Sequence, residues 1–280
     1  LQTKKKMKIK KKETTELIEA TKKNDIKRVK KLIEEEKKEV DEKNKYEETA
    51  LMIACTENNI EIAEELLKNK ANPNEKTTFG ETILQYAIYK NRTEIVKKMI
   101  ETQQATADTK NKYGDAAIHI ACKQQNKEIV EELIKAKVKL NEKGGGGETP
   151  IEIASRKNDT CIVKQLLKAK VKPEREKQKE NTPLVYAVQQ ENKEMIKALL
   201  KAKATMDVYD TYGIDLFEYT KEDIKEVLLL NPTIEKELPL SYFKSLFQKK
   251  IKFIKKVLQL HEGFIYTIHQ KKSLLHHLLN

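Results

Sequence analysis

The chain has 280 residues, of which 38% are hydrophobic and 36% are charged, and it contains no Trp. So little apolar mass disfavours a single large globular core and suits a thin, elongated protein. No segment approaches the roughly 18 apolar residues of a membrane-spanning helix. The basic N-terminus is not followed by an apolar region of the kind found in a signal peptide. Because the chain starts at Leu1, we interpret it as a fragment or a processed form.

The formal net charge of +12 is concentrated at the two ends. Residues 1–12 contain seven lysines and no acid, residues 244–256 contain six more and no acid, and residues 13–243 are close to neutral. We interpret residues 1–12 as a disordered basic tail. Nucleic-acid binding by these ends is an alternative with a steep expected salt dependence, but the near-neutral middle disfavours it for the whole protein.

A short motif recurs along the chain. It reads ETALMIA at 48–54, ETILQYA at 81–87, DAAIHIA at 115–121, ETPIEIA at 148–154 and NTPLVYA at 181–187. The second residue of each copy serves as an anchor, and the spacing between anchors is always 33 or 34 residues. The anchors are Thr15, Thr49, Thr82, Ala116, Thr149, Thr182 and Asp215. A fixed period of this size indicates a repeat architecture.

Each repeat contains two short segments with helical apolar spacing. The first begins at the anchor, where Thr followed by Pro150 or Pro183 is typical of an N-cap and a first helical turn. The second contains an apolar block thirteen residues after the anchor, as in IAEELL at 62–67. Between the two segments lies Asn24, Asn58, Asn91 or Asn158, in a position where a tight turn needs the positive φ that Asn tolerates.

This pattern resembles the ankyrin repeat, whose signature is a TPLHxA motif, two antiparallel helices and a projecting hairpin loop. The resemblance covers residues 13–219, and we interpret residues 220–280 as degenerate ankyrin-like repeats. It implies an all-α solenoid of stacked antiparallel helix pairs. Gly80, Gly114, Gly147 and Gly213 occupy the family's loop-turn glycine position. His119 occupies the family's histidine position, where the resemblance implies a structural hydrogen bond between the turn and the helix.

Two departures from the family pattern lead to expectations about the backbone. The glycine after the second helix is replaced by Lys70, Lys137, Lys170 and Lys203, each of which should cost about 1 kcal/mol in a left-handed cap. The GGGG run at 144–147 predicts an unusually flexible loop tip.

Two surface positions carry the candidate partner-binding residues. Three residues before the anchor, four aromatic residues predict a ladder along the loop tips: Tyr46, Phe79, Tyr113 and Tyr212. Each ring could instead pack on the neighbouring loop. Seven and eight residues after the anchor, the groove side of the first helix carries Tyr89, Lys90, Lys123, Arg156 and Lys157. These cations favour an acidic or phosphorylated segment as partner, although in so lysine-rich a chain an exposed position is often basic by chance.

The sequence contains no enzyme signature, and we expect no catalytic residue, metal or cofactor. Cys55, Cys122 and Cys161 lack metal-ligand spacing, so free thiols in a reducing cytosol are expected. We therefore predict a non-enzymatic, cytoplasmic scaffold that binds another protein through its concave groove and loop tips. The host cytosol is the expected location if the protein is a secreted effector.

The alternative function is the recognition arm of a larger effector, enzyme, channel or ubiquitin-ligase adaptor, whose active part lies outside this sequence. The segment LPLSYFKSLF at 238–247 has the Leu-Pro start of an F-box-like helix, which favours the adaptor version. The 33-residue spacing between Leu240 and Ser273 favours degenerate repeats in the same region.

Overall fold

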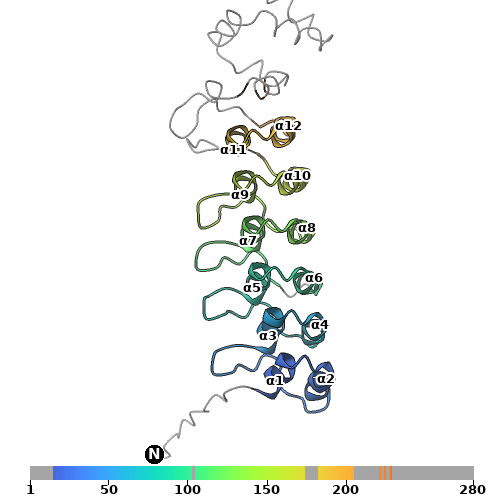
Figure 1. Ribbon diagram of the computed structural model, residues 1–280. Helices are drawn as coiled ribbons and strands as arrows, with labels where there is room; N and C mark the ends of the chain where they lie inside the picture. Colours follow the sequence, from blue (N-terminus) through green and yellow to red (C-terminus); the bar gives the residue numbers. More distant parts are fainter. Residues whose placement is uncertain are drawn as a thin grey trace, which may run out of the picture.

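The computed structural model describes residues 15–102, 105–173 and 182–204, and the single positions 221, 224 and 228. In these ranges the chain forms twelve α-helices arranged in two parallel columns (Figure 1). The inner column contains the first helix of each repeat: α1 (Glu16–Lys22), α3 (Ala50–Glu57), α5 (Ile83–Tyr89), α7 (Ala117–Lys123), α9 (Pro150–Arg156) and α11 (Pro183–Gln189). The outer column contains the second: α2 (Ile26–Glu34), α4 (Ile60–Lys68), α6 (Thr93–Glu101), α8 (Lys127–Lys135), α10 (Thr160–Lys168) and α12 (Lys193–Lys201).

The first helix of every described repeat starts where the sequence predicts it. The hydroxyl oxygens of Thr15, Thr49, Thr82 and Thr182 accept a hydrogen bond from the backbone N–H three residues later, at 3.2–3.3 Å. At Thr149 the cap involves the side chain of Glu152, whose carboxylate accepts from both the backbone N–H and the hydroxyl of Thr149. Each cap satisfies backbone N–H groups that have no partner inside the helix.

Both predicted left-handed positions have positive φ. Asn24, Asn58, Asn91 and Asn158 have φ of 53–59° between the two helices, as expected for Asn. After the second helix the lysines have similar values: Lys37 54°, Lys70 65°, Lys137 58°, Lys170 62° and Lys203 63°. The chain therefore accepts lysine at a position for which glycine is the least strained residue.

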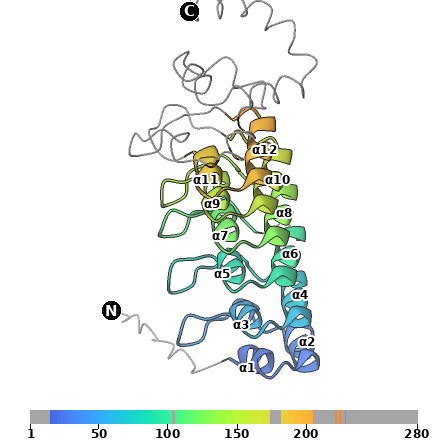
Figure 2. The ribbon, with the colours of Figure 1, turned by 45° about the horizontal axis from the view of Figure 1, so that its top comes forward.

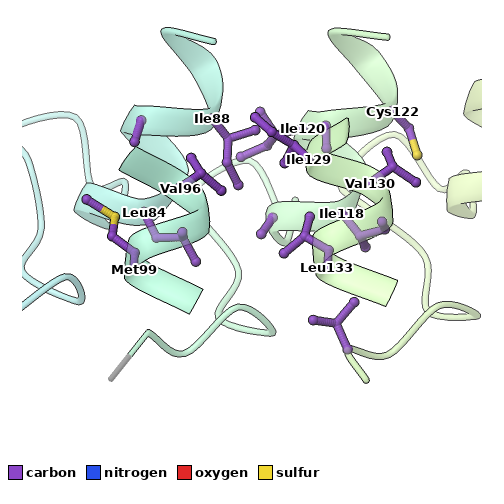
Figure 3. Close-up of a cluster of buried hydrophobic side chains, with 14 of the residues drawn as sticks. Leu84, Ile88, Val96, Met99, Ile118, Ile120, Cys122, Ile129, Val130 and Leu133 are labelled. Atoms are coloured by element: carbon purple, nitrogen blue, oxygen red, sulfur yellow. The ribbon is translucent and has the colours of Figure 1, made fainter. Parts of the chain in front are cut away.

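The core is a continuous apolar layer between the two helix columns. Figure 3 shows it at the third and fourth repeats, where Leu84 and Ile88 of α5 face Val96 and Met99 of α6, and the same arrangement follows in α7 and α8. Leu84, Ile88, Val96 and Met99 have no exposed surface. Each repeat contacts its neighbours through both columns, so apolar burial accumulates along the array without a single centre.

The loops between repeats project from the inner column, on the side away from the outer column (Figure 2). Their ends form a repeated turn at residues 44–48, 77–81, 111–115 and 144–148, which we name the fingertips. In each fingertip the first residue donates its N–H to the carbonyl of the last, at 2.8–3.1 Å. The described residues contain an isolated bridge between Lys76 and Thr82 and no strand, so these turns stand in place of extended hairpins.

The GGGG segment, for which the sequence predicts a flexible loop tip, forms a hydrogen-bonded turn in the structure. Gly144 donates to the carbonyl of Glu148, and Gly147, with φ of 77°, donates to the carbonyl of Gly144. A Cβ atom on Gly145 would lie 1.3 Å from the carbonyl oxygen of Tyr113. The glycine is therefore required for close packing of one fingertip on the next.

Several predictions fall outside the described residues. The basic tail at 1–12, the anchor Asp215, the ring of Tyr212 and the turn at Gly213 belong to this group. Of the predicted degenerate repeats at 220–280, the structure describes Lys221, Ile224 and Leu228, of which the last two are buried against the core.

Candidate interaction surface

The fingertips hold their aromatic residues by a side chain two positions earlier. The Oδ1 atom of Asn44 accepts from the N–H of Tyr46 and of Glu48, and Oδ1 of Asn111 accepts from Tyr113 and Asp115, all at 2.9–3.0 Å. The hydroxyl of Thr77 accepts from the N–H of Phe79 at 3.3 Å. These local turns fix the backbone below each ring, so the ring is presented by an ordered support.

Three consecutive fingertips each expose an aromatic side chain. The exposed fractions are 58% for Tyr46, 64% for Phe79 and 61% for Tyr113. Phe79 and Tyr113 are linked by Lys112, whose Nζ lies 5.5 Å from the centre of the first ring and 5.0 Å from the second. Adjacent rings therefore share a cation, an arrangement that stabilises both ring positions and leaves much of each ring accessible.

Two of the predicted groove cations are paired with acids of their own repeat. Lys123 donates to Asp115 at 2.5 Å, and Arg156 donates to both carboxylate oxygens of Glu148 at 2.7 and 2.8 Å. The bond to Glu148 raises the pKa of Arg156 above its ordinary value. Both cations are thus already paired with an acid of the protein, and both pairs connect the first helix to the fingertip before it.

The other predicted groove residues are exposed. Tyr89 has 57% of its surface exposed at the end of α5, and Lys90 follows it. The Nζ atom of Lys90 lies 5.5 Å from the ring centre of Tyr86, and Lys157 occupies the matching position after α9. Within the described part of the chain, neither Lys90 nor Lys157 has a carboxylate at ion-pair distance.

His119 has the structural role that the resemblance implies. Its Nδ1 accepts from the N–H of Ala116 at 3.2 Å, which caps α7 in place of a threonine, and its Nε2 lies 2.9 Å from the carbonyl oxygen of Glu142. With Nδ1 as acceptor, Nε2 carries the proton and donates to that carbonyl. Burial is the main cause that lowers the pKa of His119 below 6.5. The imidazole therefore joins the start of α7 to the loop that follows α8.

The structure shows no reactive constellation in the residues that it describes. Cys55 and Cys122 are buried, and burial raises the pKa of the Cys55 thiol to about 12. Groups of three or more His, Cys, Asp or Glu side chains able to hold a metal are not found across the described ranges. None of the described helices is long and apolar enough to cross a membrane.

Five residues that contribute to this surface were not predicted from sequence. Asn44 and Asn111 lie five residues before their anchors, and Lys112 lies four before. The acids Asp115 and Glu148 directly precede the anchor. Asp115 and Glu148 could have been noticed from the sequence, because ETALMIA, ETILQYA, DAAIHIA and ETPIEIA all begin with an acid. Their pairing with a side chain eight residues later depends on how the fingertip folds back toward the helix.

Stacked helix pairs of 33-residue period, with projecting loops, define a solenoid of helical repeats. The family model that matches this chain describes ankyrin repeats in three copies, and its matches cover residues 3–77, 67–144, 91–177 and 118–212. The chain therefore belongs to the ankyrin-repeat family, whose members generally act as protein–protein interaction modules.

Solved structures agree with this assignment. The ankyrin repeat domain of human ASB11 is 25% identical, with a TM-score of 0.61 over 78% of this chain and 98% of that domain. An ankyrin repeat domain from Acinetobacter baumannii AYE is 29% identical, with a TM-score of 0.62 over 68% and 98%. The ankyrin repeat domain of Bcl-3, at 16% identity and a TM-score of 0.67 over 78% and 99%, shows likeness of fold alone. A search of the curated proteins found no match.

Proposed function

We propose that this protein is a non-enzymatic scaffold that binds a partner protein through its fingertips and the adjoining groove face of the inner helices. The ladder of Tyr46, Phe79 and Tyr113 carries the proposal. Three rings that are each more than half exposed, at one position of successive repeats, would offer a partner a line of contacts. Aromatic rings on ordered backbone lose little conformational entropy on binding, which makes them effective interface anchors.

An acidic or phosphorylated segment of the partner would bind beside this ladder. Lys90 and Lys157 are exposed and are not paired with an acid in the described part of the chain, and Lys112 holds a cation between two of the rings. Lys123 and Arg156 contribute less to such a contact because Asp115 and Glu148 already bind them. The buried free thiols of Cys55 and Cys122 are consistent with a reducing cytosol as the place of action.

Site-specific photo-crosslinking tests the proposal with little change to the surface. A photoreactive phenylalanine analogue would replace Phe79 or Tyr113, and in the control it would replace Glu61, which is exposed on outer helix α4. We expect partner adducts from a lysate at positions 79 and 113 and none at 61. Adducts confined to position 61 would place binding on the outer face and overturn the proposal.

Alanine variants test how much the aromatic rings contribute to partner affinity. Phe79→Ala with Tyr113→Ala should release the crosslinked partner while the melting temperature stays close to that of the parent, because both side chains are exposed. Unchanged partner affinity in a folded double variant would contradict a role for the ladder.

A further inference from the structure

The outer column changes its charge along the array. Residues 60–73, which contain α4, have two lysines and three glutamates, and residues 127–140, which contain α8, have four lysines and three glutamates. Residues 160–173, which contain α10, have four lysines and no acid. Residues 193–204, which contain α12, have four lysines and one glutamate. Positive charge is therefore concentrated on the last two described outer helices.

Six exposed lysines form this concentration, which we name the α10–α12 lysine patch. They are Lys168, Lys170, Lys172, Lys197, Lys201 and Lys203. The single acid of these two segments, Glu194, already accepts from Lys164 at 2.5 Å. Within the described ranges, none of the six patch lysines lies at ion-pair distance from a carboxylate. Among the described residues, no carboxylate therefore offsets the charge of the patch.

The patch is compact because the repeats place its members side by side. Helices α10 and α12 pack against each other in the outer column (Figure 1). Lys168 and Lys201 end their helices, and Lys170 and Lys203 follow at the left-handed position, so equivalent lysines lie about one helix spacing, roughly 10 Å, apart. The loops project from the opposite column, which separates this patch from the fingertips.

Helix capping alone does not account for this charge. A cation near a helix C-terminus interacts favourably with the helix dipole, and Lys68 and Lys135 satisfy that preference at the ends of α4 and α8. Those helices balance their lysines with glutamates, as Lys135 does with Glu131 and Glu132. The absence of such balance on α10 leaves like charges close together, and they repel each other until an anion binds.

We propose that the α10–α12 lysine patch binds an acidic segment of a partner protein. Its residue types favour that partner over a nucleic acid, because the patch contains neither arginine for bidentate phosphate contacts nor an aromatic ring for base stacking. They also favour it over a membrane. The large exposed hydrophobic side chains of the described residues lie elsewhere, so α10 and α12 offer nothing to insert into lipid.

The repeat symmetry provides a matched control for the test. In the test variant, Lys168, Lys170, Lys201 and Lys203 are changed to Gln. In the control variant, the same four structural positions of α4 and α8, Lys68, Lys70, Lys135 and Lys137, are changed to Gln. Both variants lose the same net charge at the same kind of helix end, and circular dichroism would verify that both are folded.

The probe is a fluorescein-labelled oligoglutamate peptide, and its affinity for the full chain is measured by fluorescence anisotropy. We expect the test variant to lose at least about tenfold in affinity and the control variant to stay within about twofold of the parent. Added salt should weaken parental binding, because exposed ion pairs are screened. Equal losses in both variants would mean that overall charge alone attracts the peptide, and would overturn the proposal.

Carbodiimide coupling of the bound peptide locates it, since the reagent joins a carboxylate to a lysine amine that touches it. We expect mass spectrometry to find the adducts on the α10–α12 lysine patch. Adducts confined to residues 1–12 or 244–256 would assign peptide binding to the basic ends instead. An RNA duplex or a phosphatidylserine vesicle that binds the parent more tightly than the peptide, and loses binding in the test variant, would show that the class of partner is wrong.

Discussion

The hydrogen bonds of His119 in the fourth repeat require a neutral imidazole. Its Nδ1 accepts from Ala116 and its Nε2 donates to Glu142, so a proton on Nδ1 would break the cap of α7 inside a buried site. The neighbouring repeat makes the same two connections without a titrating group. Gln85 accepts from the N–H of Thr82 and donates to the carbonyl of Thr109.

His119→Gln should therefore remove a pH-dependent part of the stability. The folded pKa of His119 lies below 6.5, so the unfolded chain binds the proton more readily and the contribution of the imidazole is complete above that value. As the pH falls below about 6.5, the parent should lose about 1.4 kcal/mol for each unit by which the pKa is lowered. Urea unfolding of both proteins at several pH values measures the difference. A parent and a variant with parallel pH profiles would contradict this role.

The left-handed lysines give a second prediction for single residues. Lys170→Gly should raise the free energy of unfolding by about 1 kcal/mol, because glycine adopts the φ of 62° without a Cβ clash. The control is Lys197→Gly inside helix α12, which should lower stability by about 0.5–1 kcal/mol. Thermal unfolding compares the two. A loss of stability at both positions would show that lysine makes a compensating contact at position 170.

Among the described glycines, Gly145 of the fourth fingertip is the one where an added Cβ would come closest to another atom. Gly145 lies against the carbonyl of Tyr113, and its N–H donates to Asp115 at 3.1 Å. Gly146 is the next residue, and a Cβ there would meet only Glu148, at 3.8 Å. A side chain is therefore sterically excluded at Gly145 but has room at Gly146.

Gly145→Ala should destabilise the protein by roughly 1–3 kcal/mol, because the fingertip must move away from its neighbour. Gly146→Ala should change stability by less than about 0.5 kcal/mol. Amide hydrogen exchange at residues 113–115 and 144–148 reports the local effect, and chemical unfolding reports the global one. Similar behaviour of the two variants would argue against direct packing between these fingertips.

At the scale of the whole molecule, stability is distributed over interfaces between like units. In the described part of the chain, the main contacts of each repeat are with the adjacent repeats of the same column, and the buried residues form one continuous cluster. Removal of one full period preserves the type of interface on both sides of the cut, whereas removal of part of a period does not.

Deletion of residues 116–148 should leave a folded protein in which Asp115 precedes Thr149 at a normal anchor. We expect a helical circular dichroism spectrum and a cooperative unfolding transition. The free energy of unfolding should depend less steeply on denaturant concentration than in the parent, because less surface is exposed on unfolding. Deletion of α7 alone (Ala117–Lys123) should abolish cooperative unfolding, because α8 loses the apolar face that it packs against. A cooperative product of the second deletion would contradict the description of the repeat as the folding unit.

The sequence by itself determined the repeat, its two helices and its left-handed turns. Those features depend on local chemistry, namely a capping threonine, apolar residues at helical spacing and Asn at positive φ, and each recurs at a fixed distance. It also placed the aromatic residues at one position of the loops. Local rules were sufficient because every interface in a solenoid lies between neighbours in sequence.

Only the tertiary structure decided how the surface charges are used. Lys123 and Arg156 looked like free cations of the groove, but the folded fingertip brings Asp115 and Glu148 to them. The sequence predicts flexibility for the GGGG segment, and the structure adds that Gly145 packs against the neighbouring fingertip. In the described part of the chain, the α10–α12 lysine patch keeps its charge because Glu194, the acid of its two segments, pairs across the repeat interface with Lys164. Such pairings depend on distances between side chains of different elements, which composition and spacing do not specify.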